Sequence, residues 1–405
     1  MLSFIYNILI LLSIPIILPL GYIFAWKKGE DKDYFERFGY IKLGKKLENS
    51  IWFHCASVGE VRSIKSLINI IRQQYKDIGI IISTTTATGK KIAISEINPD
   101  ISFLLPVENS VAISHIIDIT GTKIFFIVDT EIWPNLIRTV SKKIPLYLIN
   151  GRLSDGSAKR YAFFKLFFKN TFNRFTKIYT KSSDDAQKFI SIIGPTEKVI
   201  PVGNIKFYNI SVPVNLGIIP AGKRLFVAGS THRGEEEVIL NSYLAIQEED
   251  IFDQLILAPR HLNRVEEVEN LCVKKGLKAA RFGKYYSEAD VVIVDVFGIL
   301  EYIYSVASKI FVGGSMVAIG GHNIFEALQF RKVVAVGKHM DNFLEIYQLA
   351  KRYNLVVDIS NGDDMLKFLR CNDIKTDFDG FFEEIDKRGR EILKPILSDI
   401  RDVFS

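Results

Sequence analysis

The feature that most constrains this fold is an alternation of short apolar runs with amphipathic stretches. In the first half of the chain the apolar runs include "NSIWFH", "IGIIIST", "KIFFIVD" and "IPLYLIN". The stretch after the first run, "EVRSIKSLINIIRQQY", repeats its apolar residues at helical spacing. Short apolar runs that alternate with helices are typical of a parallel sheet covered on both faces. The sequence therefore predicts a doubly wound α/β domain.

The same alternation starts again after an irregular segment at 209–223. This segment, "NISVPVNLGIIPAGK", has two prolines, two glycines and no helical period, as linkers do. After it come "LFVAGS", "QLILAP", "VVIVD", "KIFVGGS" and "KVVAVG". We expect one Rossmann-like domain over 28–212 and a second over 223–405, whose terminal helix can pack back on the first domain. Two such domains that face a cleft would bind ligands at the carboxyl ends of their strands.

Composition excludes several other classes of protein. The chain has 405 residues, which is too long for one ordinary core and suits two domains. Its three cysteines, Cys55, Cys272 and Cys371, form no CxxC pair, which argues against a disulfide frame and a zinc site. The formal net charge of +6 suits an anionic ligand or a membrane surface. Without an Arg-rich tract or a zinc finger, we expect no nucleic-acid partner.

The N-terminal segment is apolar and carries no charge from Leu2 to Trp26. A stretch of about 20 apolar residues is long enough to span a bilayer. It lacks the basic start and the small-residue cleavage site of a signal peptide. Lys27 and Lys28 follow at once, and such positive flanks stay on the cytoplasmic side. We expect an uncleaved membrane anchor over 1–27; the alternative is a buried core helix.

The first candidate for chemistry is the glutamate in "HCASVGEVRS". Glu60 follows the first apolar run, comes directly after Gly59 and heads the predicted helix. A carboxylate at the carboxyl end of a strand is well placed to act as a general base. The alternative is structural, because a glutamate in the first turn stabilises a helix by typically about 0.3–1 kcal/mol.

A glycine-rich motif in the second half, "VGGSMVAIGGHNIFEAL", is the best candidate for binding a nucleotide. Its glycines at 313, 314, 320 and 321 would let backbone amides approach a ligand closely. A helix is expected to start near Asn323, where its N-terminus would favour a phosphate, and Glu326 would accept hydrogen bonds from ribose. The alternative is a plain glycine-rich connection with a glutamate in the first helical turn.

Other patterns narrow the chemistry further. Arg260 in "LAPRHLNR" follows a strand and would bind a phosphate or a carboxylate, or would simply be a solvated surface arginine. The chain has no GxxxxGK[ST], GxGxxG, GxSxG or HExxH motif, and the D-x-D pair at Asp377–Asp379 is far from any predicted strand end. We therefore expect no bound metal in catalysis.

Taken together, the motifs resemble one family, the 3-deoxy-D-manno-octulosonic acid (Kdo) transferases of lipopolysaccharide synthesis. Those enzymes are membrane-anchored glycosyltransferases of the GT-B fold, which move Kdo from CMP-Kdo onto a lipid A precursor. The resemblance runs from the N-terminal segment to about Phe343. The motifs that carry it, in order, are "ERFG", "HCASVGE", "TTTATG", "DTEIWPNLI", "NGRLS", "GNIKF", "GSTHRGEE", "PRH", "VGGSMVAIGGHN" and "GKHMDNF".

The resemblance also implies roles for individual residues. Glu60 matches the catalytic base, and Asp129 and Lys206 match positions that stabilise the transition state. The positions implied to bind CMP are Pro259, Arg260, Phe297, Gly298, Ile299, Asn323, Ile324, Phe325 and Glu326. Two positions depart from the family pattern: Asp129 replaces a glutamate, and Ile299 replaces an acid and would contact CMP only through its backbone.

The implied reaction is an inverting transfer in one displacement, with Glu60 as the base and no cofactor beyond the donor CMP-Kdo. The implied acceptor is lipid IVA, and the implied location is the cytoplasmic side of the bacterial inner membrane. The aromatic and basic stretch 158–177 suits anionic lipids or a core helix equally well. Two other functions fit the pattern: a GT-B transferase that uses a UDP-sugar, and a membrane-anchored nucleotide-binding protein without catalysis.

Overall fold

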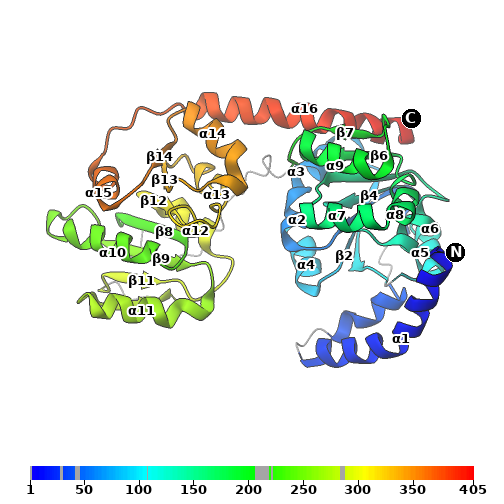
Figure 1. Cartoon of the computed structure of the whole chain (residues 1–405), viewed down its shortest axis with the longest axis horizontal. Coiled ribbons are helices and arrows are strands. Elements are labelled where there is room, and N and C mark those ends of the chain that lie inside the picture. The colour runs from blue at the N-terminus through cyan, green and yellow to red at the C-terminus, as the bar shows by residue number, and fades with distance from the viewer. Residues whose placement is uncertain are drawn as a thin grey trace. The chain divides into compact units, whose positions relative to one another are not determined.

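The computed structural model of the chain describes residues 2–27, 31–41, 46–106, 108–205, 219, 222–282 and 288–405. The chain divides into two compact units, one made of Met1–Asn209 and Asp386–Ser405 and the other of Ile210–Ile385. Each unit is a parallel sheet flanked by helices (Figure 1). The prediction of two parallel α/β domains is confirmed.

The sheet of the first unit has the strand order β3-β2-β1-β4-β5-β6-β7, and every neighbouring pair is parallel. The chain therefore reverses its direction of winding between β1 and β4, and such a switch point is where doubly wound folds bind ligands. The strands are β1 (Ser50–Cys55), β2 (Gly79–Thr84), β3 (Ile101–Leu104), β4 (Thr122–Val128), β5 (Leu146–Gly151), β6 (Lys177–Thr180) and β7 (Val199–Pro201).

Both faces of this sheet are buried, because successive residues of a strand point to opposite faces. On one face Trp52 packs against Phe125, with ring centroids 4.5 Å apart. On the other face Phe53 stacks on Phe126 at 5.1 Å. The covering helices are α2 (Val58–Ser63), α3 (Lys65–Gln74), α4 (Ala87–Ile92), α5 (Ser110–Ile119), α6 (Pro134–Val140), α7 (Asp155–Phe163), α8 (Lys165–Phe172) and α9 (Ser183–Ile193).

The N-terminal helix α1 (Leu2–Lys27) contacts the first unit, where the ring of Tyr6 lies 5.8 Å from that of Phe167. A 3₁₀ helix at Asp31–Phe38 follows it. Within the described ranges, every helix is either too short or too polar to cross a bilayer. The membrane anchor expected over 1–27 is therefore not confirmed.

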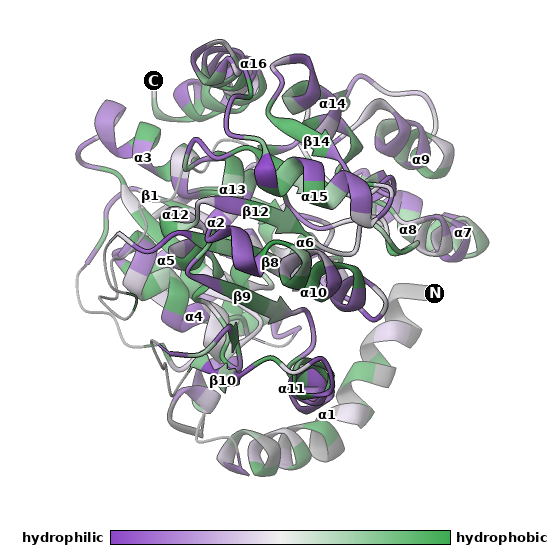
Figure 2. Cartoon of the chain, turned by 90° about the vertical axis from the view of Figure 1, so that its left-hand side faces the viewer, coloured by the Kyte–Doolittle hydropathy of each residue, from purple (hydrophilic) through white to green (hydrophobic). Residues whose placement is uncertain are grey.

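The second unit repeats the design of the first. Its sheet has the order β10-β11-β9-β8-β12-β13-β14, again parallel, with the switch point between β8 and β12. In Figure 2 strand β9 is largely hydrophobic, whereas helix α11 alternates between the two colours, as a helix with one buried face does. The strands are β8 (Leu225–Thr231), β9 (Gln254–Pro259), β10 (Ala279–Arg281), β11 (Val291–Ile293), β12 (Lys309–Val312), β13 (Val334–Val336) and β14 (Val356–Asp358). The helices are α10 (Glu235–Ala245), α11 (Val265–Lys274), α12 (Leu300–Val306), α13 (Phe325–Leu328), α14 (Leu344–Arg352) and α15 (Gly362–Arg370).

The terminal helix α16 (Phe378–Phe404) runs through Pro395, and its second half belongs to the first unit. Ile392, Ile396 and Ile400 lie in the same hydrophobic cluster as Phe53. The structure therefore groups 386–405 with the first unit. The sequence assigned this range to the domain over 223–405 but allowed its terminal helix to pack back on the first domain, as α16 does. The apolar stripe of α16 is the reason, because it covers one face of the first sheet.

Candidate active site

Glu60 lies in the first turn of α2, just after β1 and next to the switch point of the first sheet. The hydroxyl of Ser57 accepts a hydrogen bond from the Glu60 N–H and donates one to Glu60 Oε1 at 2.9 Å. Glu60 Oε2 accepts the N–H of Ala56 at 2.6 Å. The carboxylate therefore has a fixed orientation and helps to cap the helix at the same time.

The surroundings of Glu60 make it a stronger base than an ordinary glutamate. Burial raises the pKa of its carboxyl, and the charges of Asp129 and Glu131 raise it further. The hydrogen bonds from Ala56 and Ser57 act in the opposite direction without cancelling the rise. A carboxylate with a raised pKa holds an abstracted proton more firmly, as a general base requires.

Asp129 follows β4, directly across the switch point from β1. Its backbone is left-handed, with φ of 54°, and its partner Asn150, near the end of β5, is also left-handed, with φ of 57°. Asn150 Nδ2 donates a hydrogen bond to Asp129 Oδ1, and Asn150 Oδ1 accepts the N–H of Ile205 at 3.3 Å. Left-handed residues other than glycine are strained and often occur at functional sites.

Glu131 is the site residue that the sequence reasoning missed. Burial raises the pKa of its carboxyl and the charge of Asp129 adds to the rise, while Trp133 Nε1–H donates to Oε2 at 3.0 Å. The available signal was its position two residues after Asp129 in the same loop. Three acidic side chains, Glu60, Asp129 and Glu131, thus surround the switch point of the first sheet.

The "ERFG" motif packs against the loops beside this acidic site. Arg37 Nη2 donates to the carbonyl of Thr85 after β2 at 2.6 Å. The carboxylate of Glu36 accepts a hydrogen bond from the buried Lys90 ammonium at 2.6 Å and another from the N–H of Leu104 at 2.8 Å. These contacts fix the ends of β2 and β3, and with them the "TTTATG" turn.

In the second unit the glycine-rich loop is organised by a buried carboxylate. Glu235 is fully buried and accepts four backbone N–H groups, from His232 at 2.9 Å, Gly314 at 2.8 Å, Ser315 at 3.0 Å and Met316 at 2.9 Å. Burial raises the pKa of Glu235 and the four N–H groups lower it.

The amides of residues 313–316 and 321 in this loop therefore make hydrogen bonds within the protein. Besides the three that bond Glu235, Gly313 N–H donates to Gly229 O and Gly321 N–H donates to Gly314 O, both at 2.8 Å. The expectation that Gly313, Gly314 and Gly321 offer their amides to a ligand is wrong. At Gly313 the reason for glycine is close packing, since a Cβ would lie 2.5 Å from the carbonyl of Ser230.

The residues implied to bind CMP follow β9, β11 and β12, all at the carboxyl edge of the second sheet. Pro259 ends β9 and is buried, and Arg260 after it is exposed. Phe297 is 74% exposed, Gly298 has a left-handed φ of 85°, and Ile299 directly precedes α12. Lys206 lies outside the described residues.

The segment from Asn323 to Glu326 differs from the expectation in two ways. Helix α13 begins at Phe325 and lasts one turn, so it is too short to add a substantial dipole. Ile324 and Phe325 are buried in the core, so only their backbone is available to a ligand. Asn323 Oδ1 accepts the N–H of Phe325 at 3.1 Å, and its Nδ2 donates to Glu326 Oε1 at 3.3 Å.

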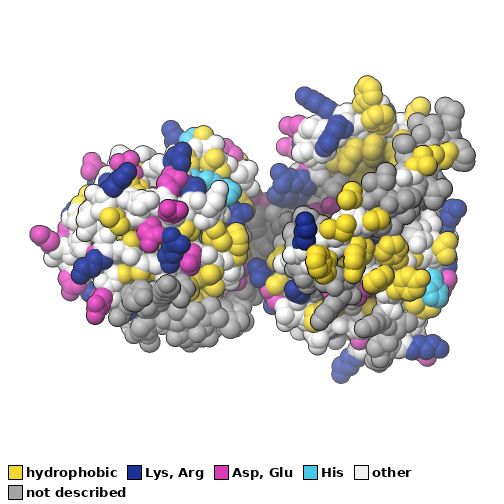
Figure 3. All heavy atoms as spheres, turned by 90° about the horizontal axis from the view of Figure 1, so that it is seen from below, with side chains coloured by type: hydrophobic (Ala, Val, Ile, Leu, Met, Phe, Trp, Pro, Cys, Tyr) yellow, Lys and Arg dark blue, Asp and Glu magenta, His cyan; other side chains and the backbone are white. Residues whose placement is uncertain are grey.

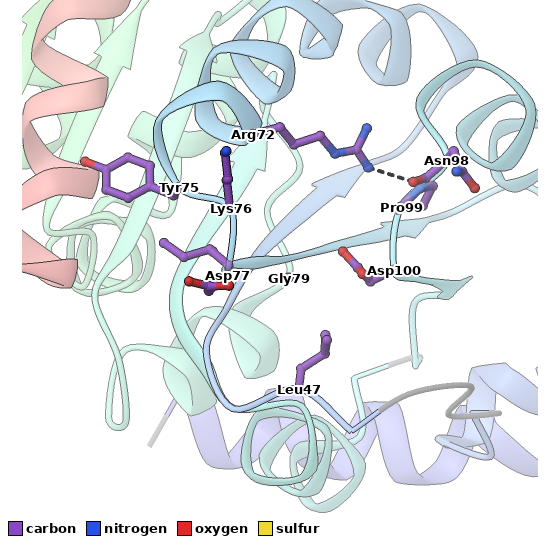
Figure 4. A pocket seen from close by; sticks show the side chains of 10 residues that line it. Leu47, Arg72, Tyr75, Lys76, Asp77, Gly79, Asn98, Pro99 and Asp100 are labelled. Atoms are coloured by element: carbon purple, nitrogen blue, oxygen red, sulfur yellow. Dashed lines mark hydrogen bonds between the residues drawn. The ribbon is translucent and has the colours of Figure 1, made fainter.

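A cavity of ≈ 630 Å³ in the first unit lies at the opposite end of the sheet from the acidic residues (Figure 4). It is lined by Gly79 and Asp100, which start β2 and precede β3. The guanidinium of Arg72 donates to the carbonyls of Ile97 at 2.7 Å and Asn98 at 2.6 Å. The guanidinium of Arg72 is thus already hydrogen-bonded to backbone carbonyls, and we do not assign catalysis to this cavity.

Comparison with known proteins shows that a solved glycosyltransferase shares this fold of two parallel-sheet domains. A solved glycosyltransferase structure from Rickettsia africae matches with a TM-score of 0.56 at 12% identity, covering 88% of this chain and 99% of that one, which shows the fold alone. A family profile described as 3-deoxy-D-manno-octulosonic-acid transferase (kdotransferase) matches residues 32–209.

Full-length relatives identify the family. The 3-deoxy-D-manno-octulosonic acid transferase of Rickettsia typhi is 32% identical over 353 residues, covering 83% of this chain and 76% of that protein. A bifunctional glycosyltransferase/methyltransferase of Fusobacterium nucleatum is 31% identical over 392 residues, covering 89% of this chain. The chain spans 60% of the length of that second relative. The chain belongs to the 3-deoxy-D-manno-octulosonic acid transferase family.

Proposed function

We propose that this protein transfers Kdo from CMP-Kdo to lipid IVA with inversion at the anomeric carbon, and that Glu60 is the general base. The observation that carries the proposal is the buried Glu60 carboxylate at the β1/β4 switch point, whose pKa is raised by burial and by neighbouring acids. Membership of the family supports Kdo as the transferred sugar. Glu60 in the first unit is a base suited to a hydroxyl acceptor.

The proposed reaction is a single displacement. The acceptor hydroxyl gives its proton to a Glu60 oxygen while the hydroxyl oxygen bonds to the anomeric carbon of Kdo. The bond from that carbon to the phosphate oxygen breaks, and CMP leaves with the bonding electrons. The carboxylate of Asp129 would stabilise the positive charge that develops at the sugar ring, and Arg260 would stabilise the negative charge on the phosphate of CMP.

The location we propose is the cytoplasmic side of the inner membrane, where the protein would contact anionic lipids. Exposed aromatic and aliphatic side chains support it: Phe163 is 82% exposed, Phe164 54% and Leu166 76%. Figure 3 shows hydrophobic side chains gathered on one face of the first unit, with Lys and Arg among them. Helix α7 has no buried residue, whereas Phe172 and Phe175 fill the core, so only the earlier part of 158–177 is available to lipid.

The test is a reaction of the purified full-length protein with CMP-Kdo and tetraacylated lipid A precursor, with products read by mass spectrometry. We expect the acceptor to gain the mass of Kdo. The Glu60→Gln variant should fold and lose at least about 100-fold in rate, the lower end of what a general base contributes. A matched variant at an exposed acid, Glu237→Gln, should keep the rate. Near-normal transfer by folded Glu60→Gln would exclude the base assignment, and transfer from a UDP-sugar instead would exclude the donor.

A further inference from the structure

Two histidines from distant parts of the second unit meet at its switch point. His232 follows β8 and His322 lies in the loop after β12. Their Nε2 atoms are 2.8 Å apart, and their rings are nearly parallel, with centroids 5.1 Å apart and planes within 9°. A third histidine, His261, presents its ring to His232 at 5.7 Å. The two loops therefore bring imidazole groups together at the position where a doubly wound sheet binds its ligand.

The cations around the pair differ in whether a carboxylate balances their charge. Arg264 is paired with the buried Glu236 at 2.8 Å, and Arg233 is paired with Glu267 at 2.8 Å. Arg260, by contrast, makes no ion pair with any residue that the structure describes. The amides of residues 313–316 and 321, as shown above, are already bonded within the protein. A phosphate next to them would thus meet side chains rather than these amides.

The contact between the two Nε2 atoms fixes how many protons the pair holds. One nitrogen must donate and the other accept, so one proton lies between them. In the neutral pair a second proton sits on one of the two Nδ1 atoms, and the other Nδ1 is bare. Adding one proton gives an N–H at both Nδ1 atoms while the bridge is kept. The pair then carries one positive charge and offers two donors to an anion.

We propose that the His232–His322 pair binds the phosphate of the CMP-containing donor and takes up one proton from solvent as it does so. This inference rests on the proposed function, because it takes CMP-Kdo as the donor. In this inference the histidine pair interacts with the leaving group, CMP. The phosphate carries one negative charge in the donor and about two in released CMP. The protonated pair therefore favours the departing CMP over the bound donor.

The ligand-free pair is neutral at pH 7, which leaves room for this uptake. Burial lowers the pKa of His322 to about 4, with Arg260, His232 and His261 adding to the effect. Burial also lowers the pKa of His232; His261, Arg264 and Arg260 lower it further, and Glu236 opposes them. A bound phosphate would add negative charge next to these groups and raise both values. Affinity for CMP should therefore increase as the pH falls from 8.5 to 6.5, by at most about tenfold per pH unit.

Gly314 is what allows the pair to form. Its φ is 68°, and a Cβ there would lie 2.9 Å from Cδ2 and 3.0 Å from Nε2 of His322. Any larger residue would push the His322 ring away from His232. The glycine of this motif thus makes space for an imidazole, a role different from exposing an amide to the ligand.

The test is calorimetric titration of the full-length protein with CMP and with cytidine, in buffers of different ionisation enthalpy at pH 7.5. We expect a measurable fraction of one proton to be taken up with CMP and none with cytidine. His322→Asn and His232→Asn should each abolish the uptake and weaken CMP binding about tenfold, with cytidine binding unchanged. His115→Asn, on the exposed face of α5, is the matched control and should behave as the wild type.

Each outcome decides between the two proposals. If the wild type binds CMP without proton uptake, or if both variants keep the uptake, the histidine inference is wrong and the proposed donor stands. If the wild type binds no CMP but binds a UDP-sugar, the proposed function fails as well. The wild-type measurement needs no variant to fold, so a lack of proton uptake there is enough to refute the inference.

Discussion

Asn150 and Asp129 form a hydrogen-bonded pair in which both backbones are left-handed, with φ of 57° and 54°. Asn150→Ala should destabilise the protein by about 2 kcal/mol, because it loses the hydrogen bond and keeps a strained backbone. Asn150→Gly loses the same bond but relieves the strain, so it should cost about 1 kcal/mol less. Urea unfolding of both variants would measure the difference, and equal losses would show that strain plays no part.

The pH dependence of transfer should report the pKa of Glu60. Because that pKa is raised, the rate should fall with decreasing pH at a value above that of an ordinary glutamate. Glu131→Gln removes a like charge, so it should shift this fall to lower pH. The measurement is kcat/KM between pH 4.5 and 8. A shift to higher pH in Glu131→Gln would contradict the electrostatic coupling.

Glu108 should make the stability of the protein depend on pH. Burial raises its pKa to about 7, although the N–H of Asn135 and the charge of Arg138 lower it. Because the folded value exceeds the unfolded one, the stabilisation from this group is complete below about pH 4.5 and is lost as the pH rises through 7. Between pH 4.5 and 8 the free energy of unfolding of the wild type should therefore fall by up to about 3 kcal/mol more than that of Glu108→Gln. Chemical unfolding of both proteins at the two pH values checks this, and an equal loss of stability in wild type and variant would refute it.

Glu235 should be more important to the second unit than its neighbours in α10. Glu235→Gln places an amide NH₂ against two N–H donors of the loop, so it should destabilise the protein by about 2–4 kcal/mol. CMP binding should weaken as well, because the loop carries His322. Glu237→Gln, at an exposed position of the same helix, is the control. Thermal unfolding that is the same in both variants would contradict the assignment.

Asp399 should fasten α16 to the first sheet. It accepts hydrogen bonds from Lys177 Nζ at 2.5 Å and from the hydroxyl of Tyr179. Asp399→Asn should cost about 1–3 kcal/mol, because it leaves a half-buried ammonium and a buried hydroxyl poorly paired. Asp402→Asn, exposed on the same helix, should be close to neutral. Proteolysis of the helix, followed with time, would show whether the first variant releases it.

Sequence patterns predicted those features that depend on neighbours in the chain. The apolar runs predicted both parallel sheets, and the turn after β1 placed Glu60 at a strand end. Most of the partners of Glu235 could not be predicted, because three of the four amides it bonds are 79, 80 and 81 residues away. The same holds for His232 and His322, which are 90 residues apart. The glycine-rich motif also predicted a helix that starts near Asn323, whereas α13 begins at Phe325 and lasts one turn.

The return of α16 to the first sheet has a consequence for how the chain is made. Ile392, Ile396 and Ile400 complete the core beneath β1, and they are synthesised only after the whole of the second unit, 210–385. The second unit can therefore be completed earlier in synthesis than the first. Until α16 has been synthesised, one apolar face of the first sheet is exposed, which makes the nascent chain a natural client for chaperones.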